Sequence, residues 1–340
     1  MNNLVLAILG AQYSSPSANN GEGIATLKRF VSEAPEAVRP SFWEVCSVTD
    51  KKGAFNIAVY AYWPSVDAHK RWEAESGFGA WWQSADREGE GHGWYQEVLS
   101  PTMDRFETVF SNNEAPEGAA NMQDHVSGAM EEHGYWGSAR DRLAAAQDDE
   151  LKGENASNKG TNDHASGGTD GHTNGHTNGH TNEMPNSTPA RVRVPGKKNL
   201  CVIRSGQDWS NTLPEERKLY VETMHPVLTK GMSFLRDEGR SIGCHAMNLW
   251  DVVDTKTHEA DCERTFGLGY FEDLAALEYW SKSHQTHVDI FGGFMMYVKS
   301  LNFNISLKLY HEVYVLDAGQ QFFEYVGCHP DTGMLCALKA

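Results

Sequence analysis

The chain has 340 residues and a formal net charge of −17, from 29 lysines and arginines against 46 aspartates and glutamates. This balance disfavours a nucleic-acid groove, which needs a clustered basic face, and also disfavours adsorption to anionic membranes. Hydrophobic residues make up 40% and charged residues 22% of the sequence, the usual proportions of a soluble globular protein with a sizeable core.

The first predicted element is a buried strand at Leu4 to Leu9. This apolar run is too short for the core of a signal peptide or for a membrane span, and no basic residue precedes it. The cysteines form no CxxC pair, and scattered thiols favour a reducing compartment, so we expect a cytoplasmic protein. These cysteines are Cys46, Cys201, Cys244, Cys262, Cys328 and Cys336.

Four further elements are predicted before the middle of the chain. Apolar residues at helical spacing predict a helix at 25–32, and a run of β-forming residues predicts a strand at 55–63. This strand leads into a helical stretch that reaches Trp72, and another strand is expected at 94–98.

The segment 148–189 differs from the rest of the chain in composition. It is rich in Gly, Asn, Thr and His, has almost no apolar residues, and contains the sequence GHTNGHTNGHTN. Such a segment cannot bury enough surface to offset its ordering entropy, so we expect a disordered linker. Its histidines could capture stray metal ions, but a solvated loop is the simpler interpretation.

After the linker, the same order of elements is predicted again. A strand closes at 203–209, a helix follows at 215–237, and the residues 268–271 lead into a helix that reaches Trp280. The last predicted strand is at 305–316.

The two halves resemble each other at three places in the same order, which indicates a duplication. Each half is predicted to run strand, helix, strand, strand, helix, helix, strand, which is a βαββαβ-like unit. The corresponding stretches are 8–13 with 203–209, 59–63 with 268–271, and 94–98 with 309–313.

We therefore predict an α+β fold of two ferredoxin-like repeats whose antiparallel sheets pack face to face or close into a barrel, with helices outside. The first repeat and a connecting segment occupy 1–147, the linker 148–189, and the second repeat 190–340.

Differences between the halves point to a candidate site in the second one. The pair Arg204-Ser205 stands against Leu9-Gly10, His287 against Gly79, and His311 against Gln96. Neighbours on a strand point to opposite faces, so only one of Arg204 and Ser205 can face a pocket. A histidine among aromatic residues is more often a core residue than a ligand, so the comparison alone leaves both interpretations open.

The type of site can be narrowed by the motifs that the sequence contains. There is no HExxH or CxxC spacing for zinc, no GxGxxG or P-loop for nucleotides, and no GxSxG for a serine hydrolase. Heme needs only one axial imidazole and an apolar slot. His287 opens an apolar stretch of predicted helix that continues to Val298, so heme fits this half.

Five separated motifs resemble those of the heme-containing aldoxime dehydratases, also called phenylacetaldoxime dehydratases. The resemblance covers nearly the whole chain except the linker. The motifs are EEHGYWGSARDR at 131–142, IRSGQDW at 203–209, SHQTHVDIF at 283–291, LYHEV at 309–313 and CHPDTGML at 328–335.

This resemblance implies a role for four residues. His287 would be the axial ligand of a heme b iron, with His284 as the alternative, and His311 would be the distal catalytic residue. Ser205 would hydrogen-bond the oxime hydroxyl, and Arg142 would serve the distal pocket. The family also implies a heme-binding α+β barrel, commonly a homodimer.

Two departures from the family are expected to matter. The chain begins directly at the first strand, whereas family members usually carry an N-terminal extension that helps to cover the heme. The linker after Arg142 is also longer and richer in histidine than in the family, which could shift how Arg142 is presented.

The implied reaction converts an aldoxime, R–CH=N–OH, into a nitrile and water on ferrous heme. A protonated His311 would donate to the leaving hydroxyl and then accept the proton from carbon, because imidazole titrates near pH 6.5. Glu312 would face away from the site. The alternatives are a peroxidase-like or oxygenase-like heme activity, or a heme-based sensor.

Overall fold

The computed structural model describes residues 3–112, 116–128, 130–154, 191–260 and 263–339. Their strands form one curled, antiparallel, eleven-stranded sheet in the order β5-β10-β7-β9-β8-β2-β3-β1-β4-β11-β6. Strands and helices together make an α+β fold, as the sequence predicted.

The first half of the sheet is built from four strands with three helices between them. Its elements are β1 (Val5–Tyr13), α1 (Glu22–Ser32), β2 (Phe42–Thr49), β3 (Phe55–Trp63), α2 (Val66–Glu75), α3 (Phe78–Gln83) and β4 (Gly93–Leu99). The second half repeats this order with β7 (Leu200–Asp208), α4 (Pro214–Leu219), α5 (His225–Glu238), β8 (Cys244–Val253), β9 (Arg264–Phe271), α6 (Leu274–Ser283), α7 (Gln285–Ser300) and β10 (Lys308–Leu316).

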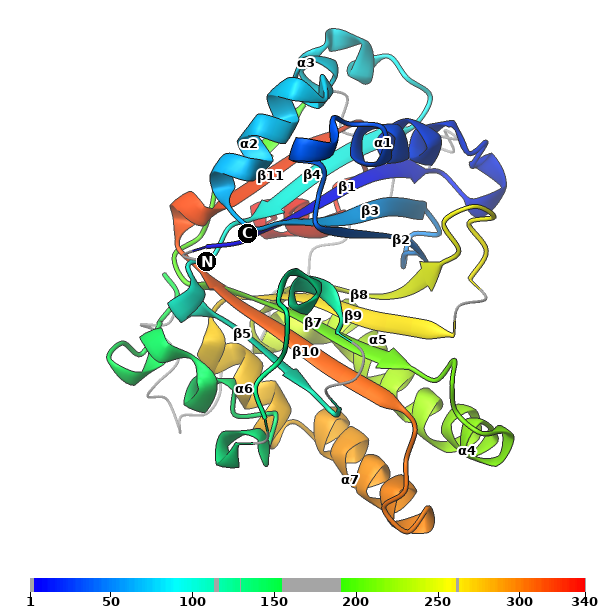
Figure 1. The fold of residues 1–340 in the computed structure, drawn as a ribbon, viewed down its shortest axis with the longest axis vertical. Helices are drawn as coiled ribbons and strands as arrows, with labels where there is room; N and C mark the ends of the chain where they lie inside the picture. Colours follow the sequence, from blue (N-terminus) through cyan, green and yellow to red (C-terminus); the bar gives the residue numbers. More distant parts are fainter. Residues whose placement is uncertain (1–2, 113–115, 129, 155–190, 261–262, 340) are drawn as a thin grey trace, which may run out of the picture.

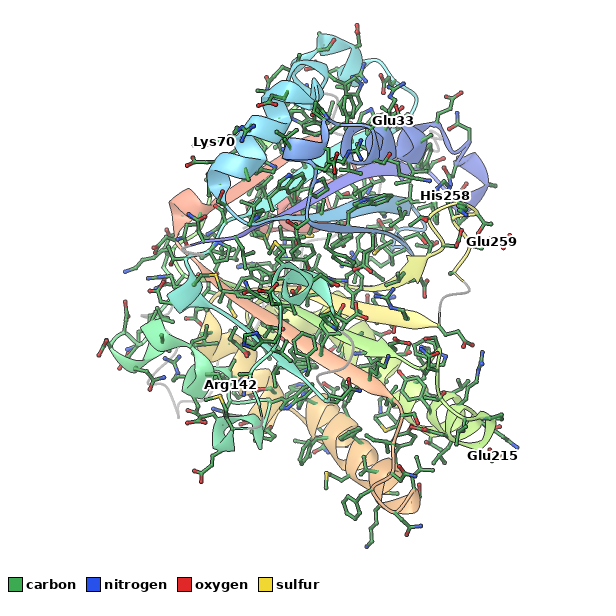
Figure 2. The ribbon with its side chains drawn as sticks, viewed as in Figure 1. Glu33, Lys70, Arg142, Glu215, His258 and Glu259 are labelled. Atoms are coloured by element: carbon green, nitrogen blue, oxygen red, sulfur yellow. The ribbon has the colours of Figure 1, made fainter. Side chains whose placement is uncertain are left out.

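The halves join where β2 pairs with β8, and from this seam they turn to face each other. Helices α1 to α3 cover the outer side of the first half, and α4 to α7 cover the outer side of the second half (Figure 1). Side chains fill the space between the two halves, whereas the exposed Lys70 and Glu33 lie in the outer helical layer (Figure 2).

Strand β1 shows how the sequence produces these layers. All nine residues of β1 are buried, because both faces of the strand are covered. Leu6 and Ile8 belong to the core between the halves, and the alternate Val5, Ala7 and Leu9 pack under the helices. The period-2 alternation of side chains divides one apolar run between two cores.

Two strands are exchanged between the halves. Strand β5 (Phe106–Phe110) follows the first half in the sequence but pairs with β10 of the second half. Strand β11 (Gln321–Val326) follows β10 but pairs with β4 of the first half and with β6 (Val192–Val194). Each half therefore completes its sheet with a strand that adjoins the other half in the sequence.

A buried carboxylate marks each half on the side that faces the other. Glu97 on β4 accepts hydrogen bonds from Tyr270 and from Tyr325, the latter at 2.5 Å. Glu312 on β10 accepts one from Tyr62 at 2.7 Å and lies opposite the fully buried Arg204. Tyr62 belongs to the first half and Tyr270 to the second, so these bonds cross the interior in both directions.

Most predicted elements occur, with differences at their ends. The last strand of the second half begins at Lys308 rather than at residue 305. The helix predicted at 215–237 is divided into α4 and α5 by a π-helical turn at Tyr220–Met224. Among the described residues, no helix is long and apolar enough to cross a membrane.

Most of the segment predicted as a linker, from 155 to 189, lies outside the described residues. Its first part, 148–154, is described. There Leu151 is fully buried in the core of the second half, and the carbonyl of Lys152 accepts a hydrogen bond from Asn199 at 2.9 Å.

We expect Arg204→Met to lower the free energy of unfolding of the protein by about 3–5 kcal/mol, because it leaves the buried Glu312 without its cation. The control is Arg71→Met, whose ion pair with Glu75 is exposed at 60% and 45%. That change is expected to cost less than about 1 kcal/mol. Chemical denaturation followed by circular dichroism measures both values, and equal losses would contradict the expectation.

Candidate active site

An apolar cavity lies between the outer face of the second half of the sheet and helices α5, α6 and α7. Its empty volume, including the open mouth, is about 950 Å³. Three methionines, Met224, Met232 and Met247, line it together with aliphatic and aromatic side chains. Among the predicted site residues, it is lined by Ser205, His287 and His311.

His287 lies in the first turn of α7 and faces this cavity. Its Nδ1 atom is buried and has no hydrogen-bond partner among the described residues. Burial lowers the pKa of His287 to about 4, and the carbonyl of Ser281 acts in the opposite direction. The ring also packs edge-on against Trp280, with centroids 4.7 Å apart. A neutral imidazole with a free nitrogen is the form that binds a metal.

His284, the alternative ligand, has a different role. It is the N-cap residue of α7, where its Nδ1 lies 2.9 Å from the hydroxyl of Thr286. Its ring stacks on Phe234 with centroids 4.1 Å apart. His284 is not among the residues that line the cavity.

His311 and Ser205 face the cavity from the sheet, because they are direct partners in the pairing of β10 with β7. On the next rung, Glu312 pairs with Arg204, and these side chains lie on the opposite side of the sheet. The alternation of side chains therefore places Ser205, not Arg204, in the cavity, as expected.

The strand register also corrects the comparison between the halves. Gln96 corresponds to His311, and its partner on β1 is Leu9, so Leu9 rather than Gly10 is the counterpart of Ser205. A slip of one residue moves a side chain to the other face of the sheet.

The surroundings of His311 favour its neutral form. Burial is the main cause that lowers its pKa, to about 3, and the nearby His287 and Arg142 act in the same direction. Trp136 lies edge-on to the ring of His311, with centroids 5.0 Å apart. The expectation that His311 titrates near its ordinary value of 6.5 therefore does not hold in this structure.

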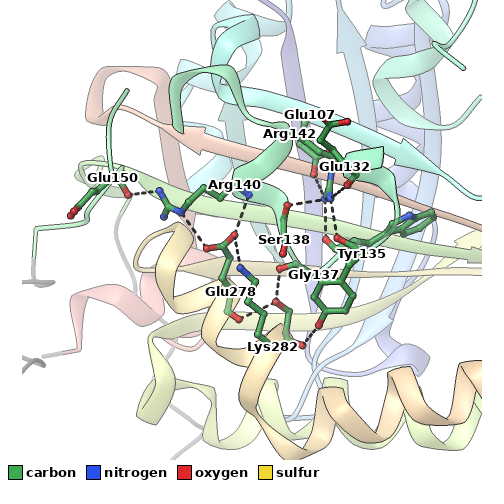
Figure 3. A network of polar contacts seen from close by, with 12 residues as sticks. Glu107, Glu132, Tyr135, Gly137, Ser138, Arg140, Arg142, Glu150, Glu278 and Lys282 are labelled. Carbon is green, nitrogen blue, oxygen red and sulfur yellow. Dashed lines mark hydrogen bonds and ion pairs between the residues drawn. The ribbon is translucent and has the colours of Figure 1, made fainter. Parts of the chain in front are cut away.

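Arg142 lies beside the cavity but does not line it. Its Nε and Nη2 atoms bind the two oxygens of Glu107 at 3.0 and 2.9 Å, and the side chain of Arg142 is 4% exposed. Its remaining donors bind backbone carbonyls of the segment that precedes it (Figure 3). The structure brings Ser205, His287 and His311 together in the cavity, whereas Arg142 lies behind the residues that line it.

Two residues that the sequence analysis did not single out belong to this wall. Trp136 lines the cavity, and Glu107 is the partner of Arg142. Trp136 lies within the motif EEHGYWGSARDR, so its position next to Arg142 was a usable signal. Glu107 lies on the exchanged strand β5, and nothing in the sequence indicates that this strand joins β10.

The equivalent space in the first half is occupied by large side chains. Trp72, Phe78 and Trp82 are buried there, and Phe78 stacks on both tryptophans with centroids 4.8 and 6.0 Å apart. Gln96 is also buried, with its amide 3.4 Å from Glu73. The asymmetry predicted from the sequence is thus visible in the packing.

The model of the haem-containing dehydratase family matches residues 7–334 of this sequence. The chain belongs to this family. The aliphatic aldoxime dehydratase of Pseudomonas chlororaphis is 36% identical to this family member over 98% of the chain and 86% of the relative. The phenylacetaldoxime dehydratase of Bacillus sp. (strain OxB-1) is 30% identical over 81% of the chain and 72% of the relative.

Solved structures of family members have the same fold as this dehydratase. A crystal structure of an aldoxime dehydratase in complex with butyraldoxime has a TM-score of 0.82 at 31% identity, and the match covers 98% of this chain and 85% of that one. A second aldoxime dehydratase structure also has a TM-score of 0.82, at 33% identity.

The residues of this dehydratase fit a heme. The cavity supplies an apolar slot, and His287 presents to it an imidazole that burial keeps neutral. These are the two requirements of a heme with one protein ligand. No group of three or more His, Cys, Asp and Glu suited to a metal ion occurs in the described part of the chain.

We expect His287→Ala to abolish stable heme binding, whereas His284→Ala should keep it. The first change removes the axial ligand, and the second removes an N-cap contact, at a cost of about 1 kcal/mol. Heme content per chain, measured by the pyridine hemochrome assay on the purified variants, checks this. Full heme in His287→Ala, with an unchanged Soret band, would transfer the ligand role to another histidine.

Proposed function

We propose that this family member dehydrates aldoximes to nitriles, using a heme b that His287 holds in the cavity of the second half. The observation that carries the proposal is the meeting of His287, from α7, with His311 and Ser205, from the sheet, in a single apolar cavity. The relatives named above are aldoxime dehydratases, which supports the same substrate class. The chain has no CxxCH motif for covalent attachment, which supports heme b.

The reaction requires loss of the hydroxyl group from nitrogen and of the proton from carbon, and these leave together as water. His287 would hold the heme, which, when bound in its ferrous state, would supply an electron-rich iron able to weaken the N–O bond of the oxime. The protein must hold the hydroxyl group, move one proton and exclude bulk water. The apolar lining, rich in methionine, serves the last of these requirements.

Ser205 and His311 divide the remaining work. The hydroxyl of Ser205 can donate a hydrogen bond to the oxime oxygen. His311, its direct cross-strand partner, can exchange a proton with the same substrate. Because this imidazole is neutral in the structure, we propose that it first accepts the proton from carbon and then passes it to the departing oxygen. The net reaction leaves His311 unchanged.

We propose linear aliphatic aldoximes as the preferred substrates. Four of the relatives, from Pseudomonas and Rhodococcus, are aliphatic aldoxime dehydratases, at 32–36% identity. One solved relative was crystallised with butyraldoxime. The decisive experiment is an anaerobic assay of the reduced protein with butyraldoxime, because dehydration needs no oxidant, whereas a peroxidase or oxygenase does. A heme-based sensor would bind the oxime without turnover.

We expect His311→Ala to keep its heme and to lose roughly 10²–10⁴-fold in kcat, because the change removes the group that moves the proton. Ser205→Ala should lose less, about 10-fold to 100-fold, because it removes one hydrogen bond. The control is Gln96→Ala, the same strand position in the first half, which should leave kcat unchanged. Steady-state nitrile formation measures all three, and high activity in His311→Ala with normal heme content would refute this role.

We expect kcat to be independent of pH, within about twofold, between pH 6 and pH 8, because a His311 with a pKa near 3 stays neutral throughout. It should fall only as the pH approaches that pKa and the base becomes protonated. The opposite assignment, a protonated His311 as the starting acid, requires kcat to fall about tenfold for each unit of rising pH. A pH profile of the heme-loaded enzyme separates the two.

We also propose that the two halves are ferredoxin-like repeats that arose by duplication, with boundaries at 147 and 190. Support comes from the strand orders β2-β3-β1-β4 and β8-β9-β7-β10. Equivalent residues recur at the same sequence separation. Glu97 and Glu312 are the buried carboxylates of the two halves. Gly118 lies close to Glu312 and Gly333 lies close to Glu97, and both glycines have a positive φ.

We also propose that the protein forms a homodimer and that it is located in the cytoplasm. Helix α7 exposes Val288, Phe291 and Met295 at helical spacing, each 43–44% accessible, which supports association through this helix. The five cysteines in the described ranges are all free and buried, which supports a reducing compartment, and Cys262 lies outside those ranges.

A further inference from the structure

The residues 132–142, here called the strap, connect the two walls of the cavity. On the sheet side, Trp136 lies against His311. On the helix side, the hydroxyl of Tyr135 donates to the carbonyl of Ser281 at 2.8 Å, and Ser281 donates to the carbonyl of Gly137 at 2.9 Å. The strap therefore contacts both the proposed base and the turn that precedes His287.

Arg142 stabilises the conformation of the strap through hydrogen bonds to its backbone. A guanidinium group has five N–H donors. In Arg142, Nε and one Nη2 donor bind Glu107, and Nη2 also binds the carbonyl of Trp136 at 2.9 Å. Nη1 lies 3.2–3.3 Å from the carbonyls of Glu132, Tyr135 and Ser138. All the donors are committed to protein atoms, so no donor is left for an oxime.

The carbonyls that Arg142 binds include that of Trp136 itself. Those of Glu132, Tyr135 and Ser138, on either side of it, lie around the guanidinium in Figure 3. Because Glu107 fixes the guanidinium to β5, the strap is tied to the strand that pairs with β10. In that pairing Val109 is the direct partner of His311. The position of the indole ring relative to His311 therefore depends on Arg142.

Trp136 separates two hollow regions. It lines the cavity that contains His287 and His311, and it also lines an open groove over β5. That groove is bounded by Thr108, Val109 and Phe110 on one side and by residues 119–128 on the other. Without the indole ring, the cavity would extend toward the groove.

We propose that Trp136 limits the size of the aldoxime side chain and that Arg142 is a positioning residue that holds Trp136 over His311 through the backbone of the strap. This inference rests on the proposed function. A substrate with a short chain fits beside the indole ring, whereas a bulky one needs the space that the ring occupies. Arg142 acts on the reaction only through the strap.

The test combines Trp136→Ala, Arg142→Gln and the double variant in one cycle. The measured quantity is the ratio of kcat/KM for phenylacetaldoxime to kcat/KM for butyraldoxime. Trp136→Ala should raise this ratio by at least about tenfold, because it opens the wall. Arg142→Gln alone should also change this ratio, because it releases the strap that holds Trp136. In the Trp136→Ala background the same substitution should change the ratio by less than about twofold.

A direct contact between Arg142 and the oxime predicts a different pattern. In that case Arg142→Gln lowers kcat for both substrates by the same factor, whether or not Trp136 is present. That outcome, or an unchanged ratio in Trp136→Ala, would overturn the proposal. Trp136→Phe and Arg142→Lys provide milder versions if the first variants fail to fold.

A second measurement needs neither heme nor activity. Hydrogen exchange of the backbone amides at 134–138 in the heme-free protein should become about tenfold faster in Arg142→Gln. The matched control is Arg140→Gln. Arg140 holds the same segment through Glu278 but binds none of the carbonyls of the Trp136 turn. Equal exchange in both variants would contradict the role of Arg142.

The two readouts also separate this inference from the proposed function. If the heme-loaded parent fails to convert either aldoxime, the proposed function fails. The hydrogen exchange still shows whether Arg142 holds the strap. If the parent is active and the exchange is unaffected, only the inference fails.

Discussion

The register between β7 and β10 is the constraint on which the site depends. One rung pairs Ser205 with His311 on the side of the helices, and the next pairs Arg204 with Glu312 on the side of the other half. A shift of β7 by one residue would turn Arg204 toward the apolar cavity and Ser205 toward the interior, so that Arg204 and Glu312 would lie on opposite sides of the sheet. The buried ion pair disfavours that shift, since each charge would then lack its partner. The same interaction that stabilises the interior therefore fixes the geometry of the proposed chemistry.

A common framework serves two purposes in this family member. Both halves have helices packed on the outer face of four antiparallel strands, but the space beneath the helices is filled differently. In the first half large aromatic rings occupy it, and in the second half smaller and more flexible side chains leave it open. An aromatic-filled layer resists deformation, whereas methionines adapt to the shape of a bound group. The first half thus acts as the rigid support of the second.

Much of this arrangement could be predicted from the sequence, because it depends on local periodicity. The alternation along β7 allowed only one of Arg204 and Ser205 to face the site, the family resemblance indicated Ser205, and the alternation along β10 placed Glu312 on the far side. The exchange of β5 and β11 could not be predicted, because strand pairing between distant segments leaves no local pattern. For the same reason, the sequence did not indicate Glu107 or its ion pair with Arg142. The low pKa of His311 could not be predicted either, because it arises from burial and from the nearby His287 and Arg142, which converge only in the folded chain.

The exchanged strands have a consequence for the order in which this protein can fold. The outer edge of β4 is covered by β11, which is formed by residues 321–326, near the end of the chain. During synthesis, β4 has emerged long before its partner exists, so its backbone donors and acceptors stay exposed until β11 has also emerged. Exposed strand edges promote pairing with other chains. The first half of the chain therefore matures last at that edge, and a ribosome that stalls before β11 would release a protein with an unprotected strand.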